Sequence, residues 1–337
     1  MGSFLEGKKL QYAVIGSGSW ATALVKLLST TQDKLYWFVR DDRNIDFIKQ
    51  YGRNRSYLRS AVLNLDKIVM SDDINEVVEA ADVLVFCIPS SYFLSQIKAL
   101  STSLDDKYIV SAIKGFVSKD NLTIAEFFHN LYHIPFENIA IVSGPTHAEE
   151  VAMEKYSYIT ISSKYHKVAE QISEAFKCHY VKVIIGTDIY GVEYSAAMKN
   201  VYAVAVGLCH TLGYGDNFIS VLVTGAYREM IHFIQQSHPD RDRIPTRSAY
   251  LGDLLVTCYS QFSRNRTFGG MIGKGYSVVS AQTEMNMVAE GYYATKSIYE
   301  IAKRENIELP IVNAMYGILY EEKNPEYTLR QLMDMLQ

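Results

Sequence analysis

The feature that most constrains this chain is a pair of glycines directly after its first apolar run. Residues 11–15 are mostly apolar, and the motif Gly16-Ser-Gly18-Ser-Trp-Ala21 follows them and opens a helical stretch. Gly16 would permit a tight turn, Gly18 would let backbone amides approach a pyrophosphate, and Ala21 would let the helix lie close on the strand. Elsewhere these letters would indicate only a Gly-Ser loop, but between a strand and a helix they predict dinucleotide binding.

The second apolar run, residues 34–39, ends at a basic residue. NAD enzymes usually place an acidic residue there, about 20 residues after the glycines, to bind the ribose 2'-hydroxyl. Here the position is Arg40, with Arg43 close behind, and a guanidinium suits a 2'-phosphate. The sequence therefore favours NADPH. Asp41 and Asp42 could offset these charges, and an Arg40 that only stacks on the adenine would leave the preference for NADP or NAD open.

The first half of the chain alternates short β-branched or aromatic runs with helical stretches, which is typical of a parallel sheet with crossover helices. From about Asp188 the sequence pattern changes. In residues 191–215 small and apolar residues occupy all sides of a predicted helix. We therefore predict an α/β chain, with a Rossmann-type parallel-sheet domain at residues 1–187 and an all-α domain at residues 188–337. The expected strands are residues 11–15, 34–39, 83–88, 108–112 and 139–142, with two more near 157–161 and 180–185.

Composition narrows the class of protein. The 48% hydrophobic and 21% charged residues are an ordinary globular mixture, and a net charge of -4 offers no basic field for nucleic acid. No uncharged apolar run reaches the length of about 18 residues needed to span a bilayer. Four scattered cysteines and an N-terminus without a signal-peptide pattern favour the cytoplasm. The histidines, including His129 and His133, form no metal-binding array, so we expect no metal.

Several later segments place polar residues inside apolar surroundings. Each has a structural explanation: Lys114 as a solvated strand-end lysine, Asp253 as a helix N-cap, and residues 263–266 as an exposed basic loop. Lys199 is harder to explain, because its helix has small or apolar neighbours on most sides. Unless its side chain snorkels to water, such a lysine needs an anionic partner to stay charged, and either Asp253 or a bound phosphate would serve.

In their order along the chain, these motifs resemble the NAD(P)-dependent glycerol-3-phosphate dehydrogenase family in its bacterial form. The shared motifs are Gly16-Ser-Gly-Ser-Trp, Ile113-Lys-Gly, Ser143-Gly-Pro, Met198-Lys199-Asn200, Gly252-Asp, Ser263-Arg-Asn-Arg-x-Phe-Gly and Val288-Ala-Glu290-Gly. The resemblance implies a cytoplasmic enzyme that reduces dihydroxyacetone phosphate to sn-glycerol 3-phosphate, reversibly, for glycerophospholipid synthesis. It also implies a Rossmann-type domain followed by a helical domain, and a homodimer through the helical domain is a further expectation.

The resemblance assigns roles to particular positions. Lys199 would be the catalytic acid/base, Asp253 would orient it, and Lys114 and Thr257 would hold or polarise the reacting oxygen. The implied cofactor-binding positions, with the two motif glycines, are Gly16, Gly18, Ser19, Trp20, Arg40, Lys114, Ala148, Arg264, Val288 and Glu290. The implied substrate positions are Lys114, Gly144, Thr146, Lys199, Asp253, Ser263, Arg264 and Asn265, of which Arg264 and Asn265 would clamp the phosphate.

The chain departs from the family pattern at a few positions. Ala21 stands where glycine is usual, and Thr146-His147 stands where Ser-Phe is commoner. Thr146 keeps the hydroxyl, whereas His147 has no assignable role. Two alternatives remain open at this point. A β-hydroxyacid or sugar-acid dehydrogenase would bind a carboxylate in place of the phosphate, and a nucleotide-sensing module would keep the fold without the chemistry.

Overall fold

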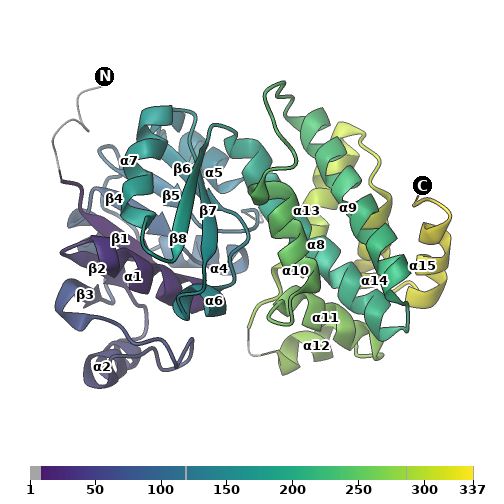
Figure 1. Cartoon of the computed structure of the whole chain (residues 1–337), viewed down its shortest axis with the longest axis horizontal. Helices are drawn as coiled ribbons and strands as arrows, with labels where there is room; N and C mark the ends of the chain where they lie inside the picture. Colours follow the sequence, from purple (N-terminus) through teal and green to yellow (C-terminus); the bar gives the residue numbers. More distant parts are fainter. Residues whose placement is uncertain (1–8, 118–119, 286, 337) are drawn as a thin grey trace. The chain divides into compact units, whose positions relative to one another are not determined.

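The computed structural model describes residues 9–117, 120–285 and 287–336, and its chain forms two compact units (Figure 1). The first unit takes its described residues from Met1–Ile88, Tyr92–Ile113 and Ile124–Ile189. The second takes its residues from Pro89–Ser91, Lys114–Thr123 and Tyr190–Gln337. Two short stretches from the first half of the chain therefore belong to the second unit.

The first unit contains an eight-stranded sheet in the order β3-β2-β1-β4-β5-β6-β7-β8. Every pairing is parallel except that of β6 with β7. The first six strands thus have the order 3-2-1-4-5-6 of doubly wound dinucleotide-binding folds, in which ligands bind at the carboxyl ends of the strands. The strands are β1 (Tyr12–Ile15), β2 (Leu35–Phe38), β3 (Ile68–Ser71), β4 (Val83–Phe86), β5 (Tyr108–Ser111), β6 (Ile139–Ser143), β7 (Ser157–Ser162) and β8 (Val181–Gly186).

Helices cover both faces of this sheet, because alternate residues of its buried strands are apolar on each side. On one face, Val14, Val85 and Val110 pack in a single core with α1 (Ser19–Thr31), α6 (Ala148–Ala152) and α7 (His166–Phe176). On the other, the Phe86 ring contacts aromatic rings of α4 (Ser90–Ile97) and α5 (Ile124–Tyr132). The remaining elements of this part are α2 (Asp42–Tyr51), α3 (Ile74–Glu79) and the 3-10 turns η1 (Leu65–Lys67) and η2 (Phe136–Asn138).

The second unit is helical. Its longest helix is α8 (Ile189–Thr211), which begins at the last residue of the first unit and whose apolar residues lie on all sides. The others are α9 (Asp216–Ser237), a π-helical turn η3 (Ser248–Gly252), α10 (Asp253–Tyr259), α11 (Arg264–Gly273), α12 (Val278–Glu284), α13 (Glu290–Glu305), α14 (Pro310–Tyr320) and α15 (Pro325–Met333). None of the helices in the described part of the chain has both the length and the apolar content to cross a bilayer.

Backbone contact between α8 and α11 positions much of the site described below. A Cβ atom added at Gly207 of α8 would lie 1.9 Å from the carbonyl oxygen of Arg266, and one added at Gly269 of α11 would lie 2.0 Å from that of Val204. Neither position can therefore carry a side chain at this separation. The two glycines let the helices touch, so the first turn of α11 lies against the helix that carries Lys199.

The predicted fold class is confirmed, and all seven expected strands are present with ends that differ by one or two residues. β3 is the strand that the sequence did not reveal. It is a four-residue edge strand in which only Ile68 is buried and Val69 is exposed, so it lacks the apolar run of the inner strands. An edge strand exposes most of its residues, as a loop does, which explains why the sequence pattern did not predict β3.

Candidate active site

A buried lysine and a buried aspartate form the centre of the second unit. Lys199 of α8 is 4% exposed and Asp253, the first residue of α10, is 1% exposed. The Lys199 amine donates a hydrogen bond to Asp253 Oδ1 and forms an ion pair with it. Asp253, one of the two anionic partners expected for Lys199, is paired with it, and the Asp253 side chain does not cap α10.

A second amine approaches the same carboxylate. Lys114 Nζ lies 3.5 Å from Asp253 Oδ2, so the two lysines flank one aspartate. The pKa of Lys199 is lowered to about 7: burial is the main cause, Asp253 opposes it, and the positive charge of Lys114 adds to it. An amine with a pKa near neutrality can both donate and accept a proton at physiological pH, which is the property required of a general acid/base.

Thr257 lies one turn after Asp253 on α10 and is 4% exposed. Its hydroxyl donates a hydrogen bond of 2.6 Å to the backbone carbonyl of Asp253, so the hydroxyl proton is already used and the oxygen is left as an acceptor. Thr257 can therefore receive a hydrogen bond from a substrate hydroxyl or from a lysine amine. A role as donor to a reacting oxygen would require this bond to break.

Two asparagines link the segments that carry these groups. Asn200 Nδ2 donates to the carbonyl oxygens of Lys114 and Ala196, at 3.2 and 3.1 Å, and Asn200 Oδ1 accepts from Asn265 Nδ2 at 2.8 Å. Asn265 Oδ1 in turn accepts from the backbone amide of Gly291 at 2.9 Å. The chain of bonds connects the Lys114 segment with α8, α11 and α13. It leaves Asn265 with one N–H group for a ligand.

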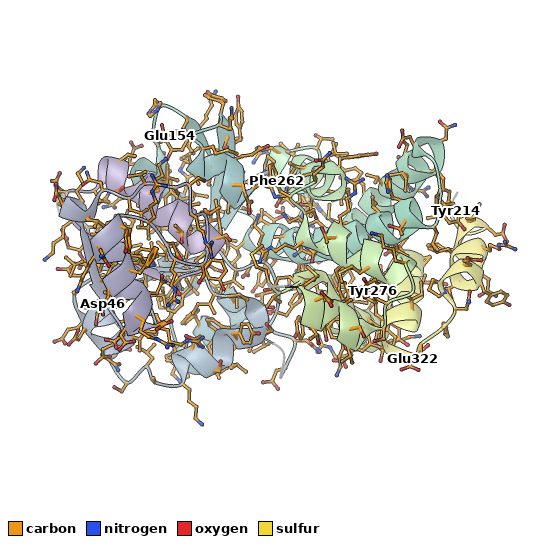
Figure 2. The ribbon with its side chains drawn as sticks, turned by 90° about the horizontal axis from the view of Figure 1, so that it is seen from below. Asp46, Glu154, Tyr214, Phe262, Tyr276 and Glu322 are labelled. Atoms are coloured by element: carbon orange, nitrogen blue, oxygen red, sulfur yellow. The ribbon has the colours of Figure 1, made fainter. Side chains whose placement is uncertain are left out.

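Ser263 and Arg264 begin α11. The Ser263 hydroxyl accepts from the backbone amide of Arg266 and caps the helix, so its structural role is the N-cap that its position suggests. Arg264 is half-buried, and its charge helps to lower the pKa of Glu290 against the larger effect of burial, which raises it. Phe262, which is exposed and labelled in Figure 2, directly precedes this pair.

Glu290 is the first residue of α13, and its carboxylate is held by Ser90. Both the backbone amide and the hydroxyl of Ser90 donate to it, the amide at 2.9 Å. Gly115 packs beside this contact, since a Cβ atom there would lie 2.5 Å from Ser90 Oγ. Val288, two residues earlier, is half-buried. Glu290 thus lies within the same set of connected segments as Asn265 and Lys114.

The glycine motif lies in the first unit with the geometry its sequence predicts. Gly16 has a φ of +127°, and a Cβ atom there would lie 2.3 Å from the carbonyl oxygen of Cys87. Gly18 is the N-cap residue of α1, which has no side-chain cap, and a Cβ atom on Gly18 would meet no atom within 4 Å. Ser19 and Trp20 form the first turn of α1. The uncapped amides and the open space suit a phosphate group.

Asn54 braces this loop, and sequence reasoning missed it. Its side chain is fully buried and donates to Ser17 O at 3.1 Å and to Thr22 Oγ1 at 2.9 Å. Asn54 Oδ1 accepts from the amides of Ser56 and Tyr57. An asparagine in a polar stretch after α2 gives no signal of this long-range contact.

Arg40 follows β2 and is exposed. Within the described parts of the chain its guanidinium makes no hydrogen bond or ion pair. Asp41 pairs with Arg43 instead, at 3.3 Å, and caps α2. The negative charge of Asp41, which could have offset that of Arg40, is therefore paired with Arg43.

The segment after β6 contains three further predicted positions. Gly144 has a φ of +110°, and a Cβ atom there would lie 2.9 Å from the carbonyl oxygen of Tyr158. The Thr146 hydroxyl donates to Gly144 O at 3.2 Å, and Ala148 is buried at the start of α6. His147 is the N-cap residue of α6 through its backbone and makes no side-chain cap.

The predicted positions thus form two groups, one in each unit. Within the second unit the structure brings together Lys114, Lys199, Asp253 and Thr257 and, through the asparagine chain, Ser263, Arg264, Asn265 and Glu290. Within the first unit lie Gly16, Gly18, Ser19, Trp20, Arg40, Gly144, Thr146 and Ala148. No cluster of three His, Cys, Asp or Glu side chains in the described residues is arranged to hold a metal ion.

Known proteins resemble this chain along nearly its whole length. The family model for the N-terminus of NAD-dependent glycerol-3-phosphate dehydrogenase matches residues 11–169, and the model for the C-terminus matches residues 188–330. The glycerol-3-phosphate dehydrogenase (NAD(P)+) of Staphylococcus carnosus is 35% identical over 325 residues, which are 95% of this chain and 97% of that protein. The one from Syntrophotalea carbinolica is 34% identical over 328 residues, 96% of this chain and 97% of that protein.

Solved structures agree with these matches. A glycerol-3-phosphate dehydrogenase from Coxiella burnetii has a TM-score of 0.88 and 26% identity, and the match covers 96% of this chain and 99% of that one. A ternary structure of D-mandelate dehydrogenase with NADH and anilino(oxo)acetate shares the fold, at a TM-score of 0.61 and 15% identity over 96% of this chain and 99% of that one. The fold is therefore common to enzymes that act on different substrates.

Proposed function

Because this chain belongs to the NAD-dependent glycerol-3-phosphate dehydrogenase family, we propose that it reduces dihydroxyacetone phosphate to sn-glycerol 3-phosphate with NADPH or NADH. The observation that carries the proposal is the buried Lys199–Asp253 pair with Lys114 beside it. The reaction is reversible, and in the reductive direction it supplies glycerophospholipid synthesis.

The residues of the first unit fit a dinucleotide. The uncapped first turn of α1 and the open space over Gly18 match the needs of a pyrophosphate. The exposed guanidinium of Arg40, which has no partner among the described residues, suits a ribose 2'-phosphate. When bound, the reduced nicotinamide supplies the hydride. Ser19, Trp20 and Ala148 are the other proposed cofactor-binding positions of the first unit. The positions proposed for the cofactor on the second unit are Arg264, Val288 and Glu290.

Lys199 supplies the proton in this proposal. As the carbonyl carbon accepts a hydride, its oxygen becomes an alkoxide, and the Lys199 amine donates a proton to that oxygen. Burial assists this step because it makes the protonated amine a stronger acid. Asp253 orients the amine, and Lys114 stabilises the developing negative charge. A proton transfer of this kind is worth about 10² to 10⁴ in rate.

The substrate phosphate is assigned to the start of α11. Arg264 provides a planar guanidinium fork, and Asn265 provides its one uncommitted N–H group. Ser263, Gly144 and Thr146 are the remaining proposed substrate positions. The buried Asp253 Oδ2, which accepts no hydrogen bond in the described part of the chain, suits a substrate hydroxyl.

A spectrophotometric assay of nicotinamide oxidation tests the function directly. Dihydroxyacetone phosphate should be reduced with at least one of the two cofactors. In the reverse direction, sn-glycerol 3-phosphate should be oxidised and a 3-hydroxyacid should not. Activity on the 3-hydroxyacid alone would favour a carboxylate-binding dehydrogenase. No activity on any of the three, with nucleotide binding intact, would favour a sensing module.

We further propose a location, an oligomeric state and separate roles for the two parts of the chain. The enzyme acts in the cytoplasm. It functions as a homodimer through its helical part, which light scattering after size-exclusion chromatography can test. Residues 1–187 form the dinucleotide-binding part and residues 188–337 the substrate and catalytic part. Lys114, Gly144 and Thr146 are the substrate positions of the first part, and Arg264, Val288 and Glu290 are the cofactor positions of the second.

A further inference from the structure

The loop between α2 and β3 carries an arginine that the resemblance does not assign. Residues 40–59 contain five arginines and one lysine against three aspartates, and Arg55 lies in the loop that follows α2. The Arg55 side chain is exposed and makes no hydrogen bond with the rest of the described chain. Figure 2 labels Asp46, which lies on α2 and marks this part of the first unit.

Two asparagines hold the backbone at Arg55 and at the residue before it. The Arg55 backbone amide donates to Asn44 Oδ1 at 3.2 Å, and Asn44 lies in the first turn of α2, the helix that follows β2 and Arg40. The preceding residue, Asn54, is bound to Ser17 and Thr22 of the glycine loop and α1. Arg55 is therefore held between the loop suited to the pyrophosphate and the strand end suited to the adenosine ribose.

The backbone bond to Asn44 holds Arg55 beside the first turn of α2, where its charge acts on Asp41. The pKa of Asp41 is lowered, mainly by the hydrogen bond from Arg43 and in smaller part by the charge of Arg55. Asp41 directly follows Arg40 in the chain, and the Arg55 backbone is bonded to Asn44 three residues further on, so the segments that carry the two arginines meet near the end of β2. Arg43 shares its charge with Asp41 through Nε, whereas the guanidiniums of Arg40 and Arg55 make no hydrogen bond or ion pair within the described residues.

We propose that Arg55 acts with Arg40 to bind the ribose 2'-phosphate of NADP, and that this pair determines the preference for the phosphorylated cofactor. The inference depends on the part of the proposed function that concerns dinucleotide binding, and not on the proposed substrate. Two guanidiniums suit a phosphate that carries nearly two negative charges, because each can donate a charge-assisted hydrogen bond. NADH presents a neutral hydroxyl at the same point and gains little from either arginine.

Titration calorimetry with the full chain tests the inference through fragments of the cofactor. The probes are 2',5'-ADP and 5'-AMP, which differ only in the 2'-phosphate. Arg55→Gln should weaken binding of 2',5'-ADP about tenfold and leave 5'-AMP within about twofold, as expected for one charge-assisted hydrogen bond at an exposed site. Arg40→Gln should act in the same way, and Lys49→Gln, an equal charge loss at the other end of α2, should change neither affinity.

Three results would overturn the inference. An unchanged ratio of the two affinities in Arg55→Gln would remove Arg55 from the site. An equal loss for both probes would show that the substitution disturbs the loop and not the 2'-phosphate contact. The same loss in Lys49→Gln would show a general field effect. Failure of the substrate assay described above would leave these fragment affinities unaffected, so the two proposals can fail separately.

Discussion

The Lys199 amine is buried against one carboxylate while a second amine lies on the far side of that carboxylate. The ion pair keeps the amine in place. Burial at the same time lowers the pKa of Lys199. A lysine on the surface would stay protonated at neutral pH and could not accept a proton there. The environment of the residue, and not its chemical type, makes it a suitable acid/base.

Replacement of the lysine should separate chemistry from cofactor binding. Lys199→Met should reduce turnover by about a hundredfold or more, because the proton donor is lost, and should leave the dissociation constant of NADPH nearly unchanged. Steady-state kinetics and fluorescence titration measure the two quantities. Lys296→Met, at an exposed site on α13, serves as the control and should keep full activity. Normal turnover in Lys199→Met would remove this residue from the mechanism.

The pH profile should report the same amine. Reduction needs protonated Lys199, so kcat/KM for dihydroxyacetone phosphate should fall as pH rises through its lowered pKa, near 7. Oxidation of glycerol 3-phosphate needs the neutral amine and should rise over the same range. Lys114→Met removes a positive charge that lowers this pKa, so the falling limb should move to higher pH in that variant. A limb that stays in place would mean that another group titrates.

At the scale of elements, the crossing of α8 and α11 depends on residues without side chains. Gly207 and Gly269 allow backbone contact, which holds Asn265 within reach of Asn200. The catalytic helix and the helix assigned to the phosphate are thereby fixed relative to each other. The asparagine chain then extends this fixed arrangement to Lys114 and to the start of α13.

A methyl group at this crossing should therefore be costly. Gly207→Ala would place a Cβ atom 1.9 Å from the carbonyl oxygen of Arg266, and α11 would have to move. We expect a loss of about 2 kcal/mol or more in the free energy of unfolding, measured with urea, together with reduced activity. Gly215→Ala, where a Cβ atom meets nothing within 4 Å, should cost far less. Equal effects of the two substitutions would refute the packing argument.

Elements were predictable where a local pattern encodes them. The inner strands are apolar runs, and the glycine motif stands directly after the first of them, so their positions followed from the sequence. β3 was missed because an edge strand buries one residue in four. The roles of Asn54 and Asn200 were missed for a different reason: each bonds to segments far away in the chain, and neither residue type signals such a contact.

At the scale of the whole molecule, a buried carboxyl group outside the proposed catalytic set links several helices. Glu229 of α9 is 8% exposed and accepts hydrogen bonds from the amides of Ile311 and Val312 at the start of α14 and from Tyr202 of α8. It ties three helices of the second unit together. Burial raises the pKa of Glu229 to about 7, while these hydrogen bonds act in the opposite direction.

The stability of the fold should accordingly depend on pH. Between about pH 4.5 and 7 the folded chain retains a proton on Glu229 that the unfolded chain releases, so this group lowers stability as pH rises. Glu229→Gln cannot titrate and should flatten that part of the curve of melting temperature against pH. Glu79→Gln, at an exposed position, should keep the wild-type slope. The idea fails if Glu229→Gln retains that slope as well.

The two stretches that leave the first half of the chain to join the helical unit set a limit on how the protein can be divided. A fragment beginning at residue 188 would lack Ser90 and Lys114, so the carboxylates of Glu290 and Asp253 would each lose a partner. Cutting the gene at that point should yield a C-terminal fragment in which these two carboxylates lack their partners. A chimaera of two relatives joined at that point would have to preserve both contacts across the junction.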